Sequence, residues 1–92
     1  MHKDDYLKAV ESATRRQLAN ICNCPADDLP PSLTTEQSLK FFLLENPKTL
    51  HVWKSTGRHG LVWLKRGRRS EIATESAIQH RLNSVEIPAT AA

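Results

Sequence analysis

The positions of proline and glycine constrain the fold of this 92-residue chain more than any other feature. Three prolines fall in the segment PADDLPPSL, residues 25–33, and they predict a stiff, irregular connection. Before this connection, residues 4–22 repeat apolar side chains at helical spacing. We expect an amphipathic helix there that ends near Asn23, because the residue that precedes a proline disfavours helix.

A second helix is predicted after the proline-rich segment. Thr34 and Gln37 fit a capping box, and a run of good helix formers follows them. The helix should cover residues 35–46 and end before Pro47. We expect its buried face to hold Leu39, Phe42 and Leu43, with Phe41 and Leu44 beside them.

Residues 50–55 and 61–66 are rich in β-branched, aromatic and leucine side chains, and the glycine-containing TGRHG separates them. This pattern predicts a β-hairpin, which must lie on the helices or gain an extra strand to be stable. A third helix is expected from Ser70 to about Val85, with residues 85–92 as a frayed tail. The predicted fold is α+β: one small domain over residues 1–92, with three helices and a basic β-hairpin between the second and third.

Positive charge is concentrated in one part of the chain. Residues 48–69 hold seven Lys or Arg and no Asp or Glu, whereas the rest holds six basic and ten acidic residues. A merely solvated surface mixes both signs, so this stretch predicts a polyanionic partner or an acidic protein surface. The candidate binding residues are Lys48, Lys54, Arg58, His59, Trp63, Lys65, Arg66, Arg68 and Arg69.

The register of the predicted hairpin decides which tryptophan is exposed. If Arg58 and His59 are the central loop residues, Trp63 faces solvent between two lysines, and a three-residue loop would instead place both tryptophans on one face. We favour the first register, in which Trp63 stacks on a base while the cations neutralise phosphates. The structural alternative is that Trp53 and Trp63 are core residues and the lysines keep an edge hairpin soluble.

Other candidate sites are weaker. Asp27 and Asp28 have no nearby partners that would complete a metal or acid–base site, and the chain has no nucleophile, P-loop or dinucleotide motif. We therefore expect a protein that is not an enzyme and that needs no cofactor and no metal. A zinc site would need ligands with unsuitable spacing, namely Cys22, Cys24, His51 and His59.

Three functions fit these features. The first is a non-enzymatic binder that docks on a nucleic acid or ribonucleoprotein through residues 48–69. The second is a winged-helix-like DNA-binding transcriptional regulator with the hairpin as its basic wing. The helix expected before the hairpin is too apolar for a major groove, so the third helix would have to read bases, through Arg69, Gln79, His80 and Arg81. The third function is an adaptor or immunity protein that binds an acidic protein surface.

The basic segment KSTGRHGLVWLKRGRR, the small size and the lack of catalytic residues give a general likeness to known proteins. In these respects the chain resembles small phage-encoded inhibitors of host machinery, including anti-CRISPR proteins. The resemblance implies a protein that binds a CRISPR surveillance complex in the host cytoplasm and blocks guide or target nucleic acid. Two cysteines are too few for a disulfide framework, which also predicts the cytoplasm. The longest apolar run, FFLL, is too short to span a membrane.

Overall fold

The structure of the protein, a computed structural model, describes residues 2–86. Its three strands form an antiparallel sheet in the order β1-β3-β2. The predicted α+β class is confirmed, with four α-helices where three were expected, and the hairpin gains a third strand. In chain order the elements are α1 (Lys3–Cys22), β1 (Ser32–Leu33), α2 (Thr35–Phe42), α3 (Lys48–Thr56), the 3₁₀ turn η1 (Arg58–Gly60), β2 (Trp63–Arg66), β3 (Arg69–Ala73) and α4 (Thr74–Ser84).

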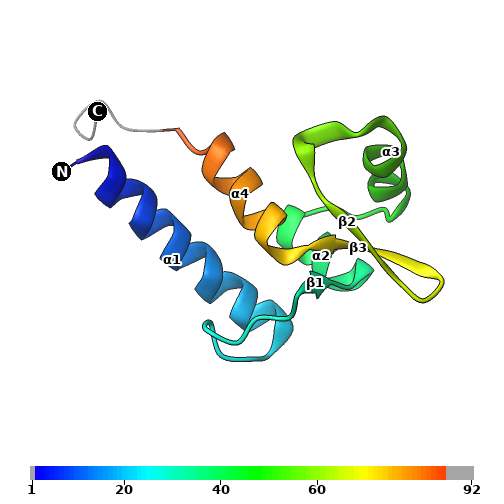
Figure 1. Cartoon of the computed structure of the whole chain (residues 1–92), viewed down its shortest axis with the longest axis horizontal. Helices are drawn as coiled ribbons and strands as arrows, with labels where there is room; N and C mark the ends of the chain where they lie inside the picture. The colour runs from blue at the N-terminus through cyan, green and yellow to red at the C-terminus, as the bar shows by residue number, and fades with distance from the viewer. Residues whose placement is uncertain (1, 87–92) are drawn as a thin grey trace.

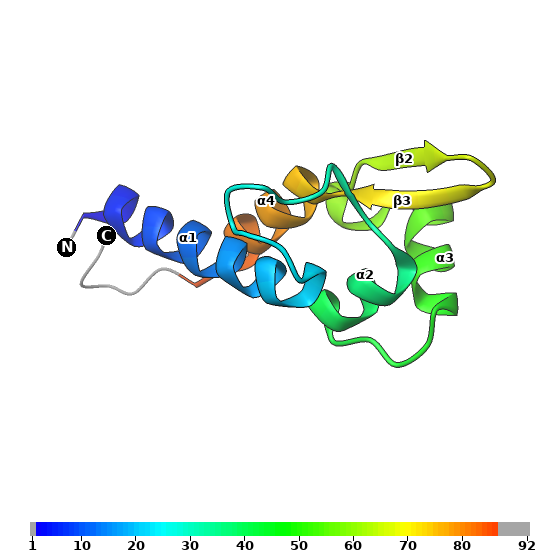
Figure 2. The same ribbon diagram turned by 90° about the horizontal axis from the view of Figure 1, so that it is seen from below.

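The helices and the sheet divide the molecule into two ends. α1 and α4 lie side by side and form one end (Figure 1). The other end holds α2, α3 and the β2–β3 hairpin, which projects away from the start of α1 (Figure 2). Most elements contribute to the core between them, and each core side chain is at most 6% exposed. These core residues are Leu18, Leu33, Phe41, Leu50, Ile72, Ala77 and Ile78.

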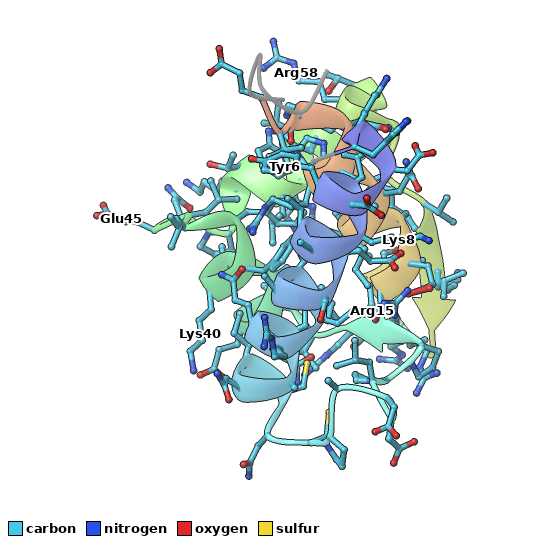
Figure 3. All side chains as sticks on the ribbon, turned by 90° about the vertical axis from the view of Figure 1, so that its left-hand side faces the viewer. Tyr6, Lys8, Arg15, Lys40, Glu45 and Arg58 are labelled. Atoms are coloured by element: carbon cyan, nitrogen blue, oxygen red, sulfur yellow. The ribbon has the colours of Figure 1, made fainter. Side chains whose placement is uncertain are left out.

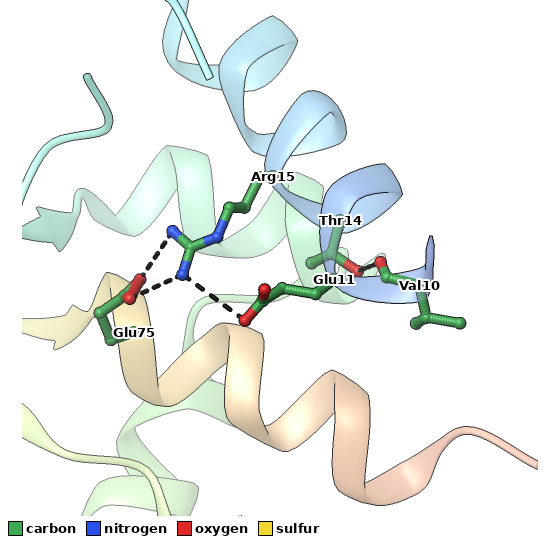
Figure 4. A network of polar contacts seen from close by, with 5 residues as sticks. All are labelled: Val10, Glu11, Thr14, Arg15 and Glu75. Carbon is green, nitrogen blue, oxygen red and sulfur yellow. Dashed lines mark hydrogen bonds and ion pairs between the residues drawn. The ribbon is translucent and has the colours of Figure 1, made fainter. Parts of the chain in front are cut away.

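An ion-pair network also joins α1 to α4 (Figure 4). Arg15 Nη1 and Nη2 donate to the two carboxylate oxygens of Glu75 at 3.1 and 2.8 Å, and Nη2 lies 3.8 Å from Glu11 Oε1. The hydrogen bond to Glu75 raises the pKa of Arg15. Because Glu75 lies in the first turn of α4, its negative charge also interacts favourably with the positive end of the helix dipole. The network therefore fixes how α4 lies on α1.

The first helix and the capping box agree with the sequence prediction. α1 begins one residue earlier than expected and ends at Asn23, which adopts the left-handed conformation with φ 56°. The Thr34 hydroxyl oxygen accepts from the Gln37 N–H at 3.2 Å, and Gln37 Oε1 accepts from the Thr34 N–H at 2.9 Å. Both local predictions are confirmed because they rest on contacts between near neighbours in the chain.

The second helix is shorter than predicted, ending at Phe42 rather than near residue 46. Leu43 closes it in the left-handed conformation, with φ 55°, and its N–H bonds to the Leu39 carbonyl. The Leu43 side chain is 86% exposed, so its predicted place on the buried face is wrong. Phe41 takes that place and is 1% exposed.

Residues 50–55, predicted as a strand, form α3 instead. Asn46 Oδ1 accepts the N–H of the first helical residue at 2.9 Å, and Gly57 ends the helix with φ 66°. Leu50 is buried, and Trp53 packs against the same core. Side chains three residues apart share one side of a helix but point to opposite faces of a strand. The core contacts of both residues therefore require the helix.

The hairpin lies further along the chain than predicted. β2 and β3 pair directly on either side of Gly67 and Arg68, so Arg58 and His59 are not its loop. Gly67 has φ 66°, which suits the first position of a two-residue hairpin turn.

The predicted start of the third helix at Ser70 is also wrong. Residues 69–73 form β3, in which Ile72 lies opposite both Leu33 of β1 and Trp63 of β2. This central position buries Ile72 in the core, and α4 follows directly from Thr74. Of the predicted frayed tail, residues 87–92 lie outside the described residues.

Candidate nucleic-acid interface

α3 presents an exposed polar face beside the hairpin (Figure 2). Its sequence, KTLHVWKST, contains no acidic residue. Helical spacing puts four of these residues on one side, namely Lys48, His51, Val52 and Ser55. Val52, the apolar member of this group, is 50% exposed. The exposed side chains of the helix that could reach a partner are Lys48, His51, Val52, Lys54 and Ser55.

The hairpin holds positive charge in an arrangement that costs stability. Arg66 lies directly opposite Arg69 in the β2–β3 pair, and Arg68 is in the turn between them. Like charges in opposite positions of a strand pair repel each other. Glu71 offsets this in part, with its carboxylate 3.9 Å from Arg66 Nε. Lys65 adds a further cation to β2.

A side-chain hydrogen bond links α3 to the hairpin. Lys54 Nζ donates to the Ser70 hydroxyl at 2.5 Å. Ser70 lies opposite Lys65 in the sheet, so Lys54 and Lys65 share one face of the hairpin, while Arg66 and Arg69 point to the other face. Between α2, α3 and the hairpin is a pocket of about 300 Å³, whose lining includes Lys54, Arg68 and Arg69.

These cations mostly lack acidic partners. Residues 48–69 hold seven Lys and Arg. Within residues 2–86, Arg66 alone among these seven has a carboxylate within 4.0 Å. Elsewhere, Arg15 pairs with two glutamates and Lys40 pairs with Glu36 at 3.5 Å. The charge asymmetry of the sequence is therefore a property of one end of the folded molecule.

Arg58 and His59 lie apart from the hairpin turn. They belong to η1, which packs against α3 and α4, and Arg58 is at the upper edge of the molecule in Figure 3. The His59 ring lies 4.6 Å from the Trp53 ring and 4.9 Å from the His80 ring, centroid to centroid. The prediction that both residues form the loop beside Trp63 is wrong, although Arg58 stays exposed at the far end of α3.

Neither tryptophan is a freely exposed stacking platform. Trp63 is half-buried opposite Ile72 and packs against the core, while its neighbours Val62 and Leu64 are 52% and 36% exposed. The favoured register, with Trp63 in solvent between two lysines, is therefore wrong. Trp53 is also half-buried, with its ring 5.3 Å from the Phe42 ring.

Of the three α4 residues considered for base reading, His80 and Arg81 pack within the fold, while Gln79 is exposed and donates to Asn83 Oδ1 at 2.9 Å. Arg81 donates to Gln17 at 3.0 Å, and its guanidinium lies 4.4 Å from the centre of the Phe41 ring. His80 packs on Phe42, and its pKa is lowered by burial and, to a lesser degree, by the neighbouring His59 and Arg81. The His80 and Arg81 side chains therefore hold α4 to the rest of the fold. Arg69, the fourth residue considered for base reading, lies in β3 and not in α4.

Sequence reasoning did not assign the exposed face of α3 to the site. His51, Val52 and Ser55 were placed on a strand, so their common side was not visible. The signals that could have revealed it are the Asn-Pro pair before the helix and Gly57 after it. Ser38, which lines the pocket from α2, carries no sequence signal at all.

Comparison with known proteins adds no relative. No family model matches the chain, and no curated protein or solved structure matches it either.

Within residues 2–86, no three His, Cys, Asp or Glu side chains gather closely enough to hold a metal ion. In the same part of the chain, none of the helices combines the length and the apolar character needed to cross a membrane.

Proposed function

We propose that this protein binds duplex DNA as a winged-helix-like domain, with α3 in the major groove and the β2–β3 hairpin as the wing. The observation that carries the proposal is an acid-free exposed helix fixed beside a basic hairpin. α2, the connection over residues 43–47 and α3 follow one another in the order of a helix-turn-helix, so α3 would be its second, recognition helix. The objection raised by the apolar residues 35–46 does not apply, because the helix before the hairpin is α3.

The side chains of α3 suit the edges of base pairs. An α-helix with its side chains is about 10–12 Å across, which fits a major groove about 12 Å wide, and the nine residues of α3 extend roughly 13 Å along it. Lys48 and Lys54 carry charge for phosphates or guanine acceptors, while His51 and Ser55 can hydrogen-bond. The exposed Val52 side chain suits contact with a thymine methyl group.

The hairpin suits the neighbouring part of the duplex. Arginine side chains bind phosphates and enter narrow minor grooves, where the negative potential is strongest. Arg66, Arg68 and Arg69 stand together at its tip, and their mutual repulsion would be relieved by an anionic partner. Because arginines at a hairpin tip suit phosphates and a narrow minor groove, we favour duplex DNA over an acidic protein surface.

Duplex DNA is also favoured over a single strand. Single-strand binders usually stack bases on exposed aromatic rings, and both tryptophans here are half-buried. Docking on a ribonucleoprotein, and the resemblance to anti-CRISPR proteins, stay predictions that no comparison supports.

Fluorescence anisotropy tests the proposal. The labelled probes are a short duplex DNA pool of random sequence and single-stranded DNA and RNA of equal length, titrated at roughly 50 to 200 mM salt. We expect the duplex to bind most tightly, with affinity that falls steeply as salt rises. Tighter binding of single-stranded RNA, or no binding to any probe at low salt, would contradict the proposal.

Two matched variants locate the interface. Lys48→Gln removes one cation from α3, and Lys8→Gln removes one from the exposed surface of α1. Loss of one phosphate contact lowers duplex affinity about fivefold at 0.15 M salt. We expect this loss for Lys48→Gln and none for Lys8→Gln. Equal effects would mean that binding depends on net charge rather than on α3.

A further inference from the structure

The pocket between α2, α3 and the hairpin combines an apolar floor with a cationic rim. Leu33, Leu50, Trp63 and Ile72 supply the apolar lining. The cationic rim holds His51, Lys54 and Arg68. Its volume, about 300 Å³, is at the small end of the range for ligand pockets. A small group that carries both negative charge and an apolar part would match this lining.

Ser38 is one of the residues that line this pocket, and its buried hydroxyl has no hydrogen-bond partner. Its side chain is 1% exposed, and its Oγ is the only buried side-chain nitrogen or oxygen in residues 2–86 without a partner. Several hydroxyls within the other helices bond back to a carbonyl of their own helix, as Thr14 does to Val10 and Ser84 does to His80. A buried hydroxyl without a partner is costly, so its position in the lining of a cationic pocket points to a ligand that accepts a hydrogen bond there.

Other groups of the pocket favour an anion. Thr35, the first residue of α2, lines the pocket, so the positive end of the helix dipole faces it. The acid in the lining is Glu71, whose side chain is 13% exposed and accepts from the Ser32 hydroxyl at 2.6 Å. Glu71 and Ile72 are adjacent in β3, so their side chains point to opposite faces of the sheet. The Glu71 carboxylate is therefore turned away from the apolar floor.

We propose that this pocket binds the phosphate group of a sugar phosphate, held by the hydroxyls of Ser38 and Thr35 and by Lys54 and Arg68. The phosphate oxygens accept the hydrogen bonds, and the sugar lies on the apolar floor. The group can come from the DNA backbone or from a free nucleotide. The first source rests on the proposed DNA binding, and the second does not.

Two-dimensional NMR titration of the ¹⁵N-labelled protein tests the pocket directly. The probes are inorganic phosphate and deoxyadenosine monophosphate at constant ionic strength, with deoxyadenosine as the control without phosphate. We expect saturable shifts of the amide signals of residues 35–39 and 66–70 with both phosphate probes, and none with deoxyadenosine. Shifts that do not saturate, or that spread over all surface cations, would overturn the proposal.

Three variants separate the pocket from the DNA interface. Ser38→Ala removes a hydrogen bond to a charged group, so we expect phosphate affinity to fall about tenfold. Lys54→Gln should lower it as well, whereas Lys48→Gln, outside the pocket, should leave it unchanged. Because Ser38→Ala also removes an unpartnered buried hydroxyl, its thermal midpoint should rise rather than fall. Unchanged phosphate affinity in Ser38→Ala would overturn the proposal.

DNA titrations of the same variants identify the source of the phosphate. If Ser38→Ala weakens duplex binding and free phosphate competes with DNA, the ligand is a backbone phosphate. If deoxyadenosine monophosphate binds while duplex affinity is the same in wild type and Ser38→Ala, the ligand is a free nucleotide. If deoxyadenosine monophosphate binds and DNA does not, the pocket stands and the proposed function fails.

Discussion

Replacing Arg69 by glutamine should make the protein more stable. Arg66 and Arg69 are both exposed and directly opposite in the β2–β3 pair. Like charges in this position cost roughly 0.2–1 kcal/mol. Because water screens exposed charges, we expect Arg69→Gln to raise the free energy of unfolding by about 0.5 kcal/mol. For a chain of this size, the thermal midpoint should rise by about 2–4 °C.

The same substitution should weaken DNA binding. Each cation that neutralises one phosphate contributes about 0.9 to the slope of log affinity against log salt. Loss of the Arg69 contact should therefore reduce the slope by about 1 and the affinity at 0.15 M salt about fivefold. Stability and affinity then change in opposite directions, which general damage to the fold cannot produce.

Two glutamine variants with the same charge change serve as controls. Arg68→Gln lies in the turn without a directly opposite partner, so it should weaken DNA binding with no gain in stability. Lys40→Gln loses the ion pair with Glu36 on α2, so it should lower stability slightly and leave DNA binding unchanged. Urea and thermal unfolding measure stability, and fluorescence anisotropy measures affinity. If Arg69→Gln binds duplex DNA as tightly as wild type, the hairpin does not contact the DNA.

Three further substitutions test the local structure. Leu43→Gly should raise the free energy of unfolding by about 0.5–1 kcal/mol, because glycine adopts φ 55° without a Cβ clash. Thermal melts measure this gain, and the control Leu43→Ala should not show it. Asn46→Ala removes the acceptor at the start of α3, and the urea midpoint should show a loss of about 1 kcal/mol. Burial keeps the pKa of His80 below its ordinary 6.5, so the unfolded chain protonates first as the pH falls. The urea midpoint of wild type should therefore drop as the pH falls through 6.5, and it should drop less in His80→Gln.

Local signals in the sequence are sufficient for the first helix and for the start of the second. The helix up to Cys22 and the Thr34–Gln37 capping box could be predicted because their contacts link residues close in the chain. The end of α2 could not, since a leucine in the left-handed conformation with its side chain in solvent contradicts both its backbone preference and its hydrophobicity. Only the path that the chain must take toward Pro47 and α3 accounts for Leu43.

α3 shows how tertiary contacts override composition. Val52, Trp53 and the residues around them favour a strand by composition. The core, however, takes up Leu50 and Trp53 from one side of the segment, and this side exists only in a helix. Asn46 and Gly57 close the two ends of that helix, but composition outweighed them in the sequence prediction.

The exposed cations could be predicted, but not their grouping. A stretch without acids stays basic in any fold, so Lys48, Lys54 and Arg68 were identified correctly as exposed charges. Which of them meet depends on the two-residue turn at Gly67, and a hairpin shifted along the chain separates Arg58 from the others. The pocket could not be predicted, because residues from α2, α3 and β3 meet there only in the folded chain.

The two ends of the molecule differ in how completely their polar and charged groups are paired. At the α1–α4 end, Arg15 and Glu75 satisfy each other. At the other end, Arg66 faces Arg69 and the buried Ser38 hydroxyl has no partner within the described residues. Proteins accept such local costs where a site requires them. A phosphate in the pocket would accept a hydrogen bond from a hydroxyl, and a phosphate on the other face of the hairpin would neutralise the paired arginines. Bound anions should therefore stabilise this end of the fold by mass action.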